Sequence, residues 1–256
     1  MPELPEAETI VRSLRPRLAG RRVLSVRFLS ARVSRDRPER IAGQTVRDVR
    51  RHGKRVWLAF DTGGLLVKLG MTGRLLADHP PGPYTRARIE LDGMTLNFDD
   101  IRQFGSLQLL DAEPAGMGPD PLEISAEEFA ARLRGRDTQL KRLLLDQTFV
   151  RGIGNIYADE ALFRAGIHPL ARTRRLGKDR ALRLHRVLIE LLELAIRHRG
   201  SSISDYVDAA GERGGFQSLH QVYGREGEPC PACGAPIRRI VAAQRGTHFC
   251  ARCQRR

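Results

Sequence analysis

The sequence predicts an α+β protein of several domains, in which an antiparallel β-domain precedes a helical domain and a short metal-binding tail. Three observations support this prediction. Strand patterns occupy residues 20–112, helix signals occupy residues 123–200, and every cysteine lies after residue 229. A chain of 256 residues is long enough to bury a core in more than one such domain.

The N-terminal domain, residues 1–112, is expected to begin with a helix and to continue as strands. Apolar side chains recur at helical spacing from residue 4 to about residue 18, although Pro16 weakens the last turn. Strand patterns follow in four stretches, which are 22–29, 55–60, 65–69 and a hairpin over 87–98 around Asp92-Gly93. These strands predict an antiparallel unit, either a sandwich or a barrel.

Two composition changes divide the remainder of the chain. Residues 113–122 are rich in proline and glycine and are expected to form a linker. A capping box at Ser125 and Glu128 then opens the first of several helices, with others predicted over 137–149, 155–165 and 178–198. We therefore expect a helical domain over 123–223 and a tail domain over 224–256, where glycine, proline and cysteine become frequent.

The charge of the chain favours a polyanionic partner. Lys and Arg number 44 against 30 Asp and Glu, which gives a formal charge of +14. This excess favours nucleic acid, although an arginine-rich surface that is merely solvated would have the same composition. No apolar run approaches the length of about 20 residues that spans a membrane, and the N-terminus is acidic where a signal peptide is basic. We expect a cytoplasmic protein without a membrane partner.

The four cysteines predict one structural zinc ion. Cys230, Cys233, Cys250 and Cys253 form the pattern C-x2-C-x16-C-x2-C, in which two tight turns each present a pair of thiolates. Four thiolates leave no open coordination position, so this zinc is expected to support folding and not catalysis. The alternative is four reduced thiols that never meet.

Two other segments carry weaker signals. Removal of Met1 would expose the secondary amine of Pro2, which is nucleophilic near neutral pH and could attack a sugar C1′ to form an iminium ion. Glu3 and Glu6 follow closely, although Pro and acids also simply favour a helix start. Further along, Gly154 and Asn155 open a predicted helix whose N–H groups could receive a phosphate, or could form an ordinary turn.

In order along the chain, these segments resemble bacterial formamidopyrimidine-DNA glycosylases, the oxidised-purine branch of a family that includes endonuclease eight. The resemblance covers essentially the whole chain and rests on PELPE, KLGMTG, IRQFG, LLLDQ with GIGNIYADEALF, QVYGREGEPC and AQRGTHFC. It implies an N-terminal β-sandwich with a catalytic helix, a helix-two-turns-helix domain and a C-terminal zinc-finger β-hairpin. It also implies a monomeric bacterial enzyme that binds damaged double-stranded DNA.

The resemblance implies catalytic roles for five residues. Pro2 would be the nucleophile, Glu3 the general acid that helps to open the deoxyribose ring, and Glu6 an assisting carboxylate. Lys54 matches the lysine that contacts the phosphate beside the lesion and is assigned to β-elimination. Arg245 matches the arginine assigned to δ-elimination and phosphate binding.

Further residues match the DNA-binding set of the family. Three of them, Met71, Arg102 and Phe104, would fill the gap left by the everted nucleotide, whose flipping costs a few kcal/mol. Gly154 and Asn155 would form the phosphate clamp, and Arg136 and Lys141 would lie near the damaged base or the DNA. The segment 200–215 would cover the flipped purine, and Arg102 would read the orphan cytosine.

The sequence departs from the common family pattern at four positions. Ile101 and Gln103 stand where Pro and a second Arg are usual, Lys68 replaces a frequent His, and Tyr84 replaces a DNA-contacting His. Lys68 could still reach a phosphate. Two other functions compete with the implied one: an endonuclease eight-like enzyme for oxidised pyrimidines, and a damage-binding protein without lyase activity. PELPE instead of PEGPE argues against the first, and the complete catalytic set argues against the second.

Overall fold

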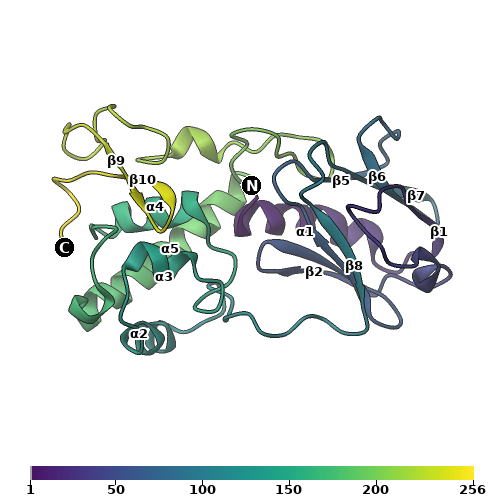
Figure 1. The fold of residues 1–256 in the computed structure, drawn as a ribbon, viewed down its shortest axis with the longest axis horizontal. Coiled ribbons are helices and arrows are strands. Elements are labelled where there is room, and N and C mark those ends of the chain that lie inside the picture. Colours follow the sequence, from purple (N-terminus) through teal and green to yellow (C-terminus); the bar gives the residue numbers. More distant parts are fainter. Residues whose placement is uncertain (1) are drawn as a thin grey trace. The chain divides into compact units, whose positions relative to one another are not determined.

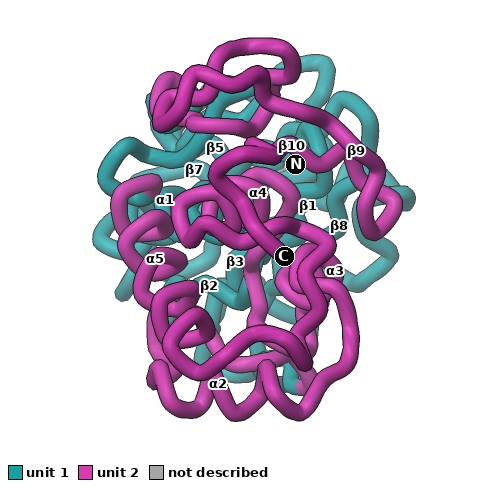
Figure 2. The backbone as a smooth tube through the Cα atoms, turned by 90° about the vertical axis from the view of Figure 1, so that its left-hand side faces the viewer, with its two compact units in different colours: residues 1–115, 196–217 teal, residues 116–195, 218–256 magenta. Residues whose placement is uncertain are grey.

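The computed structural model describes residues 2–256, so the predicted removal of Met1 falls outside the described residues. The chain divides into two compact units, which Figure 2 distinguishes by colour. Unit 1 comprises residues 1–115 and 196–217, and unit 2 comprises residues 116–195 and 218–256. Residues 196–217, which the sequence analysis assigns to the helical domain, thus belong with the N-terminal unit.

Unit 1 is built from one helix and two four-stranded antiparallel sheets (Figure 1). Helix α1 spans Leu4–Leu18. The first sheet has the order β1-β6-β7-β5, with bounds Val23–Phe28, Thr85–Leu91, Met94–Asp99 and Arg74–Ala77. The second has the order β2-β3-β4-β8, with bounds Asp48–His52, Arg55–Ala59, Gly64–Lys68 and Ser106–Leu110. A short 3-10 helix, η1, covers Pro38–Ile41.

The two sheets and α1 share one hydrophobic core. Along β6 the burial alternates residue by residue, which places one face of the strand toward this core. The core draws on the first sheet, the second sheet and α1, with members that include Ile89, Leu96, Phe98, Val56, Leu65, Val67, Ile10 and Leu14. Tyr206 and Ala209 join the same core, which explains why residues 196–217 belong to unit 1.

The predicted N-terminal helix and the predicted hairpin are confirmed. Helix α1 has the predicted bounds, and Asp92-Gly93 form the two-residue turn between β6 and β7, with φ of 72° at Gly93. Strands β2, β5 and β8 were not predicted. The sequences of β2 and β5 are DVRRH and RLLA, and neither is rich in the β-branched or aromatic residues that mark a strand.

Unit 2 contains the other four α-helices of the described chain. Helix α2 spans Ala126–Arg134 and is capped as predicted, because Ser125 Oγ accepts the Glu128 N–H at 3.1 Å. Helices α3, α4 and α5 span Leu140–Leu145, Asn155–Arg164 and Lys178–Arg197, and the 3-10 helix η2 spans Thr173–Arg175. A further 3-10 helix, η3, covers Phe216–Leu219.

Helix α3 is shorter than the predicted range of 137–149. It ends at Leu145 because the next two side chains bond to backbone groups of the following turn. Asp146 Oδ1 accepts the Thr148 N–H at 2.9 Å, and Gln147 Oε1 accepts the Gly152 N–H at 2.8 Å. Such side-chain bonds compete with the helical backbone pattern, so the chain leaves the helix here.

The C-terminal part of unit 2 is a β-hairpin whose strands β9 and β10 span Arg238–Ala242 and Arg245–Phe249. It packs on α4 through a small apolar cluster that contains Phe163, Val222 and Ile237 together with the cysteines. None of the described helices has the length and apolar character required to cross a bilayer.

Candidate functional site

The N-terminus of unit 1 places Pro2 beside two buried carboxylates. Pro2 is buried, and Glu3 and Glu6 are 3% and 1% exposed. Glu3 caps α1, and its N–H donates to Glu6 Oε2 at 2.7 Å. The first turn of the helix therefore brings the Glu6 carboxylate back to the backbone of Glu3.

The second oxygen of Glu6 binds the segment after α5. Ser201 N–H donates to Glu6 Oε1 at 2.7 Å, and Tyr206 Oη donates to the backbone oxygen of Glu6 at 3.3 Å. Gly200 has φ of 74°, and a Cβ there would lie 2.7 Å from Glu6 Oε1. Glycine is required at this position by both the backbone conformation and the approach of the carboxylate.

Tyr206 keeps its proton in this environment. Burial raises the pKa of its hydroxyl far above the ordinary value, and the Glu6 carboxylate raises it further. A protonated Tyr206 is the form that can donate to Glu6. The Glu6 carboxylate therefore accepts backbone N–H groups of Glu3 and Ser201, while the Tyr206 hydroxyl bonds to the backbone oxygen of Glu6.

The segment 200–215 is anchored to the edge of the first sheet. Ala77 N–H donates to the backbone oxygen of Ala209 at 2.9 Å, so the segment pairs with edge strand β5. Arg74 Nε donates to the backbone oxygen of Asp205 at 3.0 Å. Ile203, which precedes these two anchors in the chain, has a side chain that is 53% exposed, so this part of the segment faces solvent.

Lys54 lies at the tip of the β2–β3 hairpin. Gly53 and Lys54 form its two-residue turn, with φ of 64° at Gly53, because His52 pairs directly with Arg55. The hairpin is bound to α1 by Arg51, whose Nε lies 2.8 Å from Glu8 Oε2. Burial would raise the pKa of Glu8, but Arg12 and Arg51 outweigh burial and hold that pKa below its usual value.

Met71, Arg102 and Phe104 lie together on the surface of unit 1. Arg102 Nη1 is 3.7 Å from Met71 Sδ, and its guanidinium carbon lies 5.1 Å from the centre of the Phe104 ring. Met71 and Phe104 are 42% and 54% exposed. Exposed apolar side chains beside a guanidinium are suited to insertion between stacked bases.

A buried aspartate joins the two loops that carry this cluster. Asp100 is fully buried and accepts the Thr72 hydroxyl on Oδ1 and the Gly105 N–H on Oδ2, the latter at 2.8 Å. Thr72 Oγ1 in turn accepts the Arg102 N–H at 3.2 Å. The loops that carry the exposed cluster are therefore held together by buried hydrogen bonds. Nothing in the sequence singled out Asp100, because its role depends on contacts between loops.

The positions that depart from the family pattern lie around the same loops. Gln103 has φ of 54°, and its Oε1 accepts the Ser30 hydroxyl at 2.6 Å, so its side chain turns toward the protein. Ile101 and Tyr84 are 46% and 47% exposed. Lys68 is exposed at the end of β4, where it pairs with Ser106.

In unit 2, the turn before α4 is shaped by Gln147. Its Oε1 accepts the Gly152 N–H at 2.8 Å, and its Nε2 donates to the Ile153 oxygen at 2.9 Å. Gly154 then caps α4, which begins at Asn155. Gln147 stood within the LLLDQ motif, but no spacing rule connected it to the glycines that follow.

Two basic residues expected near DNA have different environments. Arg136 is exposed, whereas Lys141 is fully buried. Lys141 Nζ lies 2.5 Å from Asp159 Oδ1 and also donates to the Asn155 oxygen at 3.1 Å. The Lys141 ammonium therefore bonds to protein groups in the interior of unit 2. The sequence did not predict this burial.

The four cysteines meet in one cluster. Their sulfur atoms all lie within 4.8 Å of one another, with Cys233 and Cys250 at 3.5 Å and Cys230 and Cys253 at 3.8 Å. Tetrahedral zinc with Zn–S bonds of about 2.3 Å places its sulfurs about 3.8 Å apart, so the cluster fits one zinc ion. Four thiolates fill its coordination, and the ion has a structural role.

Arg245 is exposed at the turn of the zinc hairpin. It follows Ala243 and Gln244, which have φ of 49° and 59° and form the two-residue turn between β9 and β10. Behind it, Asn155 Nδ2 donates to the Gly246 oxygen at 2.8 Å. The glycine turn and the Arg245 turn, both predicted to contact phosphates, are thus joined directly within unit 2.

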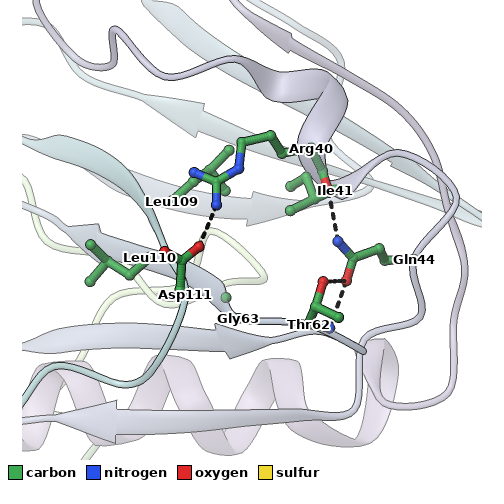
Figure 3. A pocket seen from close by; sticks show the side chains of 9 residues that line it. Arg40, Ile41, Gln44, Thr62, Gly63, Leu109, Leu110 and Asp111 are labelled. Atoms are coloured by element: carbon green, nitrogen blue, oxygen red, sulfur yellow. Dashed lines mark hydrogen bonds and ion pairs between the residues drawn. The ribbon is translucent and has the colours of Figure 1, made fainter.

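A small cavity elsewhere in unit 1 carries none of the predicted residues. It has a volume of about 100 Å³ and lies beside Arg40, Gln44, Thr62 and Asp111 (Figure 3). Its polar groups pair with one another, since Arg40 Nη2 lies 2.5 Å from Asp111 Oδ1 and Gln44 Oε1 accepts the Thr62 N–H at 2.9 Å. These groups offer no catalytic chemistry.

Three family models match consecutive parts of the chain. The formamidopyrimidine-DNA glycosylase N-terminal domain matches residues 1–107, and the formamidopyrimidine-DNA glycosylase H2TH domain matches residues 117–207. The zinc finger found in FPG and IleRS matches residues 227–256. The predicted fold class, a β-domain followed by a helix-two-turns-helix domain and a zinc finger, is confirmed.

Relatives of known name extend this match over the whole chain. A formamidopyrimidine-DNA glycosylase of Solibacter usitatus is 51% identical over 265 residues, which cover all of both chains. The crystal structure of the MutM (Fpg) protein from Thermus thermophilus has a TM-score of 0.90 at 43% identity and covers 99% of this chain and 98% of that one. Lactococcus lactis Fpg in complex with DNA that contains N7-benzyl-Fapy-dG has a TM-score of 0.90 at 34% identity, with full coverage of both chains. The chain therefore belongs to the formamidopyrimidine-DNA glycosylase family.

Proposed function

We propose that this protein is a DNA glycosylase with AP lyase activity that removes oxidised purines, such as 8-oxoguanine and formamidopyrimidines, from duplex DNA. The observation that carries this proposal is the N-terminal group of Pro2, Glu3 and Glu6, in a chain 51% identical over its full length to a formamidopyrimidine-DNA glycosylase. A secondary amine beside two ordered carboxylates is suited to covalent catalysis at a sugar carbon.

In the proposed reaction, Met1 is removed and the Pro2 nitrogen attacks C1′ of the damaged nucleotide. The bond from C1′ to the base breaks, and the base leaves with its electron pair and takes up a proton. Glu3 donates a proton to O4′ as the C1′–O4′ bond opens, which leaves an iminium ion on C1′. Glu6, held by the N–H groups of Glu3 and Ser201, keeps the terminus in place.

Strand cleavage follows by two eliminations. Loss of a proton from C2′ and breakage of the C3′–O3′ bond releases the first phosphate, and loss of a proton from C4′ with breakage of C5′–O5′ releases the second. We assign Lys54 to the phosphate beside the lesion in the first elimination and Arg245 to the second. Both side chains stand at hairpin turns, where a cation can reach the DNA backbone.

We assign DNA binding to groups of both units. Met71, Arg102 and Phe104 fill the space of the everted nucleotide, and their mutual contacts support this role. Gly154 and Asn155 receive a phosphate at the start of α4. Lys68, Tyr84 and Arg136 are further contacts, and the segment 200–215 covers the flipped purine through its main-chain N–H groups.

We also propose the partner, the oligomeric state and the cellular location of the protein. Damaged double-stranded DNA is the partner, the protein acts as a monomer, and its place is the bacterial cytoplasm where chromosomal DNA lies. Structures of Lactococcus lactis Fpg in complex with DNA that contains Fapy-dG or an abasic site support this partner. As functional regions we propose residues 1–112 for catalysis, 123–223 with the linker 113–122 for DNA binding, and 224–256 for the zinc finger.

The test is borohydride trapping on a duplex that carries 8-oxoguanine opposite cytosine. We expect a covalent adduct, because reduction of the iminium ion fixes the protein to C1′. A variant with a tag fused before Pro2 is the matched control and should form no adduct, since an acylated nitrogen has no basic lone pair. A tagged protein with full activity would disprove the N-terminal amine.

The same assay separates the competing functions. An oxidised-pyrimidine duplex trapped faster than the 8-oxoguanine duplex would identify an endonuclease eight-like enzyme. Tight duplex binding without any adduct would identify a damage-binding protein.

A further inference from the structure

A buried ion pair joins helices α3 and α4 inside unit 2. Lys141 on α3 and Asp159 on α4 approach within 2.5 Å, and both side chains are 0% exposed. Burying two charges carries a large desolvation cost, and an apolar pair of similar volume is often equally or more stable at such a site. Stability alone therefore gives no reason for charges at this position.

The ion pair extends at both ends to backbone groups of the proposed DNA-binding turns. Lys141 Nζ donates to the backbone oxygen of Asn155 at 3.1 Å. Asp159 Oδ2 accepts the His248 N–H of strand β10 at 2.9 Å, and the His248 ring nitrogen Nδ1 lies 3.4 Å from the same oxygen. The pair is thus a bridge from the start of α4 to the zinc hairpin.

A second hydrogen bond also joins the start of α4 to the zinc hairpin. Asn155 Nδ2 donates to the Gly246 oxygen at 2.8 Å. Strand β10 is therefore held at Gly246 and at His248, the positions one and three residues after Arg245. Because β10 is only five residues long, these two bonds fix the direction in which the strand leaves the turn that carries Arg245.

We propose that Lys141 and Asp159 are positioning residues that hold Arg245 in register with Asn155, so that both reach phosphates of one DNA strand. This inference rests on the proposed function, because it concerns the elimination assigned to Arg245. It also replaces the expectation that Lys141 contacts the DNA. Loss of the bridge should weaken the second elimination and phosphate binding, while attack by Pro2 at C1′ requires neither residue.

The test compares two double variants. Lys141→Met with Asp159→Leu replaces the pair by apolar side chains and removes the acceptor of the His248 N–H. Lys141→Met with Asp159→Asn also removes both charges but keeps a carbonyl oxygen for that N–H. Neither variant leaves a single buried charge, so both avoid the main reason for misfolding of the single substitutions. Zinc content and thermal unfolding check the fold of each.

The readouts are the trapping rate, the ratio of δ- to β-elimination product on an abasic duplex, and duplex affinity. For the leucine variant we expect a trapping rate within about threefold of the wild type and a product ratio lowered about tenfold, since a displacement of about 1 Å has effects of this order or larger. The asparagine variant should retain most of the wild-type ratio.

Two results would overturn the inference. One is a leucine variant that folds, keeps zinc and gives the wild-type product ratio and affinity, since the pair would then serve folding only. The other is an equal loss of product ratio in both variants, which would mean that the His248 bond is not the link. If the leucine variant fails to fold, Lys141→Met with Asp159→Ala removes the same acceptor with a smaller side chain and again leaves no single buried charge. Absence of any adduct with wild-type protein would instead refute the proposed function.

Discussion

The exposed cluster of unit 1 and the zinc hairpin of unit 2 hold their proposed DNA-binding residues in different ways. Met71, Arg102 and Phe104 stand on loops of a sandwich with a large continuous core, and one buried acid, Asp100, joins those loops. The hairpin that carries Arg245 packs on α4 through a small cluster of apolar residues and cysteines. Where apolar burial is small, other interactions must hold the structure.

Those other interactions are buried polar contacts and the metal. Besides the bridge at Asp159, the carboxylate of Glu160 accepts the N–H groups of Gln221, Val222 and Tyr223, with the shortest distance of 2.8 Å at Val222. Because the core of unit 1 is large and the apolar cluster under the zinc hairpin is small, we expect changes near Met71 to alter function with little loss of stability. Changes that touch the zinc hairpin should alter both.

Removal of zinc should have the largest effect. Binding of structural zinc contributes on the order of 10 kcal/mol in small zinc domains, so Cys250→Ala should unfold the hairpin and displace Arg245. Duplex affinity should fall at least tenfold, while the sandwich around Pro2 keeps its fold. Hydrogen exchange that follows β9 and β10 separately from β6 and β7 tests this contrast. A variant that binds and cleaves like the wild type would show that the hairpin is dispensable.

Replacement of Glu160 should have the next largest effect. Glu160→Ala leaves three N–H groups without their acceptor inside unit 2, and we expect a loss of about 3 kcal/mol in the free energy of unfolding. Glu160→Gln keeps one acceptor oxygen and should lose less. Glu193→Ala, an exposed acid on α5, is the control for loss of charge. Urea denaturation measures the free energy of unfolding of the three variants. Equal values for all three would contradict this prediction.

Acidification should weaken unit 2 through His220. Burial, with a contribution from Arg164, lowers the pKa of this imidazole to about 4. Between about pH 6.5 and pH 4 the unfolded chain then binds a proton that the folded chain does not, so stability falls as the pH falls through this window. The loss should be about 2 kcal/mol.

His220→Asn removes this proton and should flatten the dependence, although carboxylates titrate near the lower limit in both proteins. Denaturation at pH 7 and pH 4.5 gives the difference between wild type and variant. Identical slopes would show that His220 is not the titrating group.

Arg102→Ala should change selectivity with the least effect on stability. Its guanidinium lies over the exposed Phe104 ring. In the role we propose for it, Arg102 reads the orphan cytosine, whose acceptors adenine does not reproduce. We expect the wild type to excise 8-oxoguanine faster opposite cytosine than opposite adenine, and the variant to lose about tenfold of this preference. Single-turnover rates on the two duplexes measure it.

Arg27→Ala is the matched control, because it removes an exposed arginine on β1 that pairs with Glu90. Equal wild-type rates on both duplexes would show that a loop with Ile101 and Gln103 does not read the opposite base.

The sequence alone determined the order of domains, the bounds of α1, the Asp92-Gly93 hairpin and the zinc ligands. Each depends on residues close in sequence, because helical spacing, two-residue turns and C-x2-C pairs are local patterns. The proposed roles of Pro2, Glu3, Lys54 and Arg245 came from motif resemblance and remain predictions.

The way in which the candidate residues are held depends on contacts that no local pattern predicts. The C-terminal end of α3 depended on side chains that bond to the following turn. Strands β5 and β8 pair with β7 and β4, which are not their neighbours along the chain. Lys141 was expected near the damaged base or the DNA, yet it is buried, where Asp159, 18 residues later, pairs with its charge. Pairing between distant residues has no signature in local composition, and burial of a charge depends on such a partner.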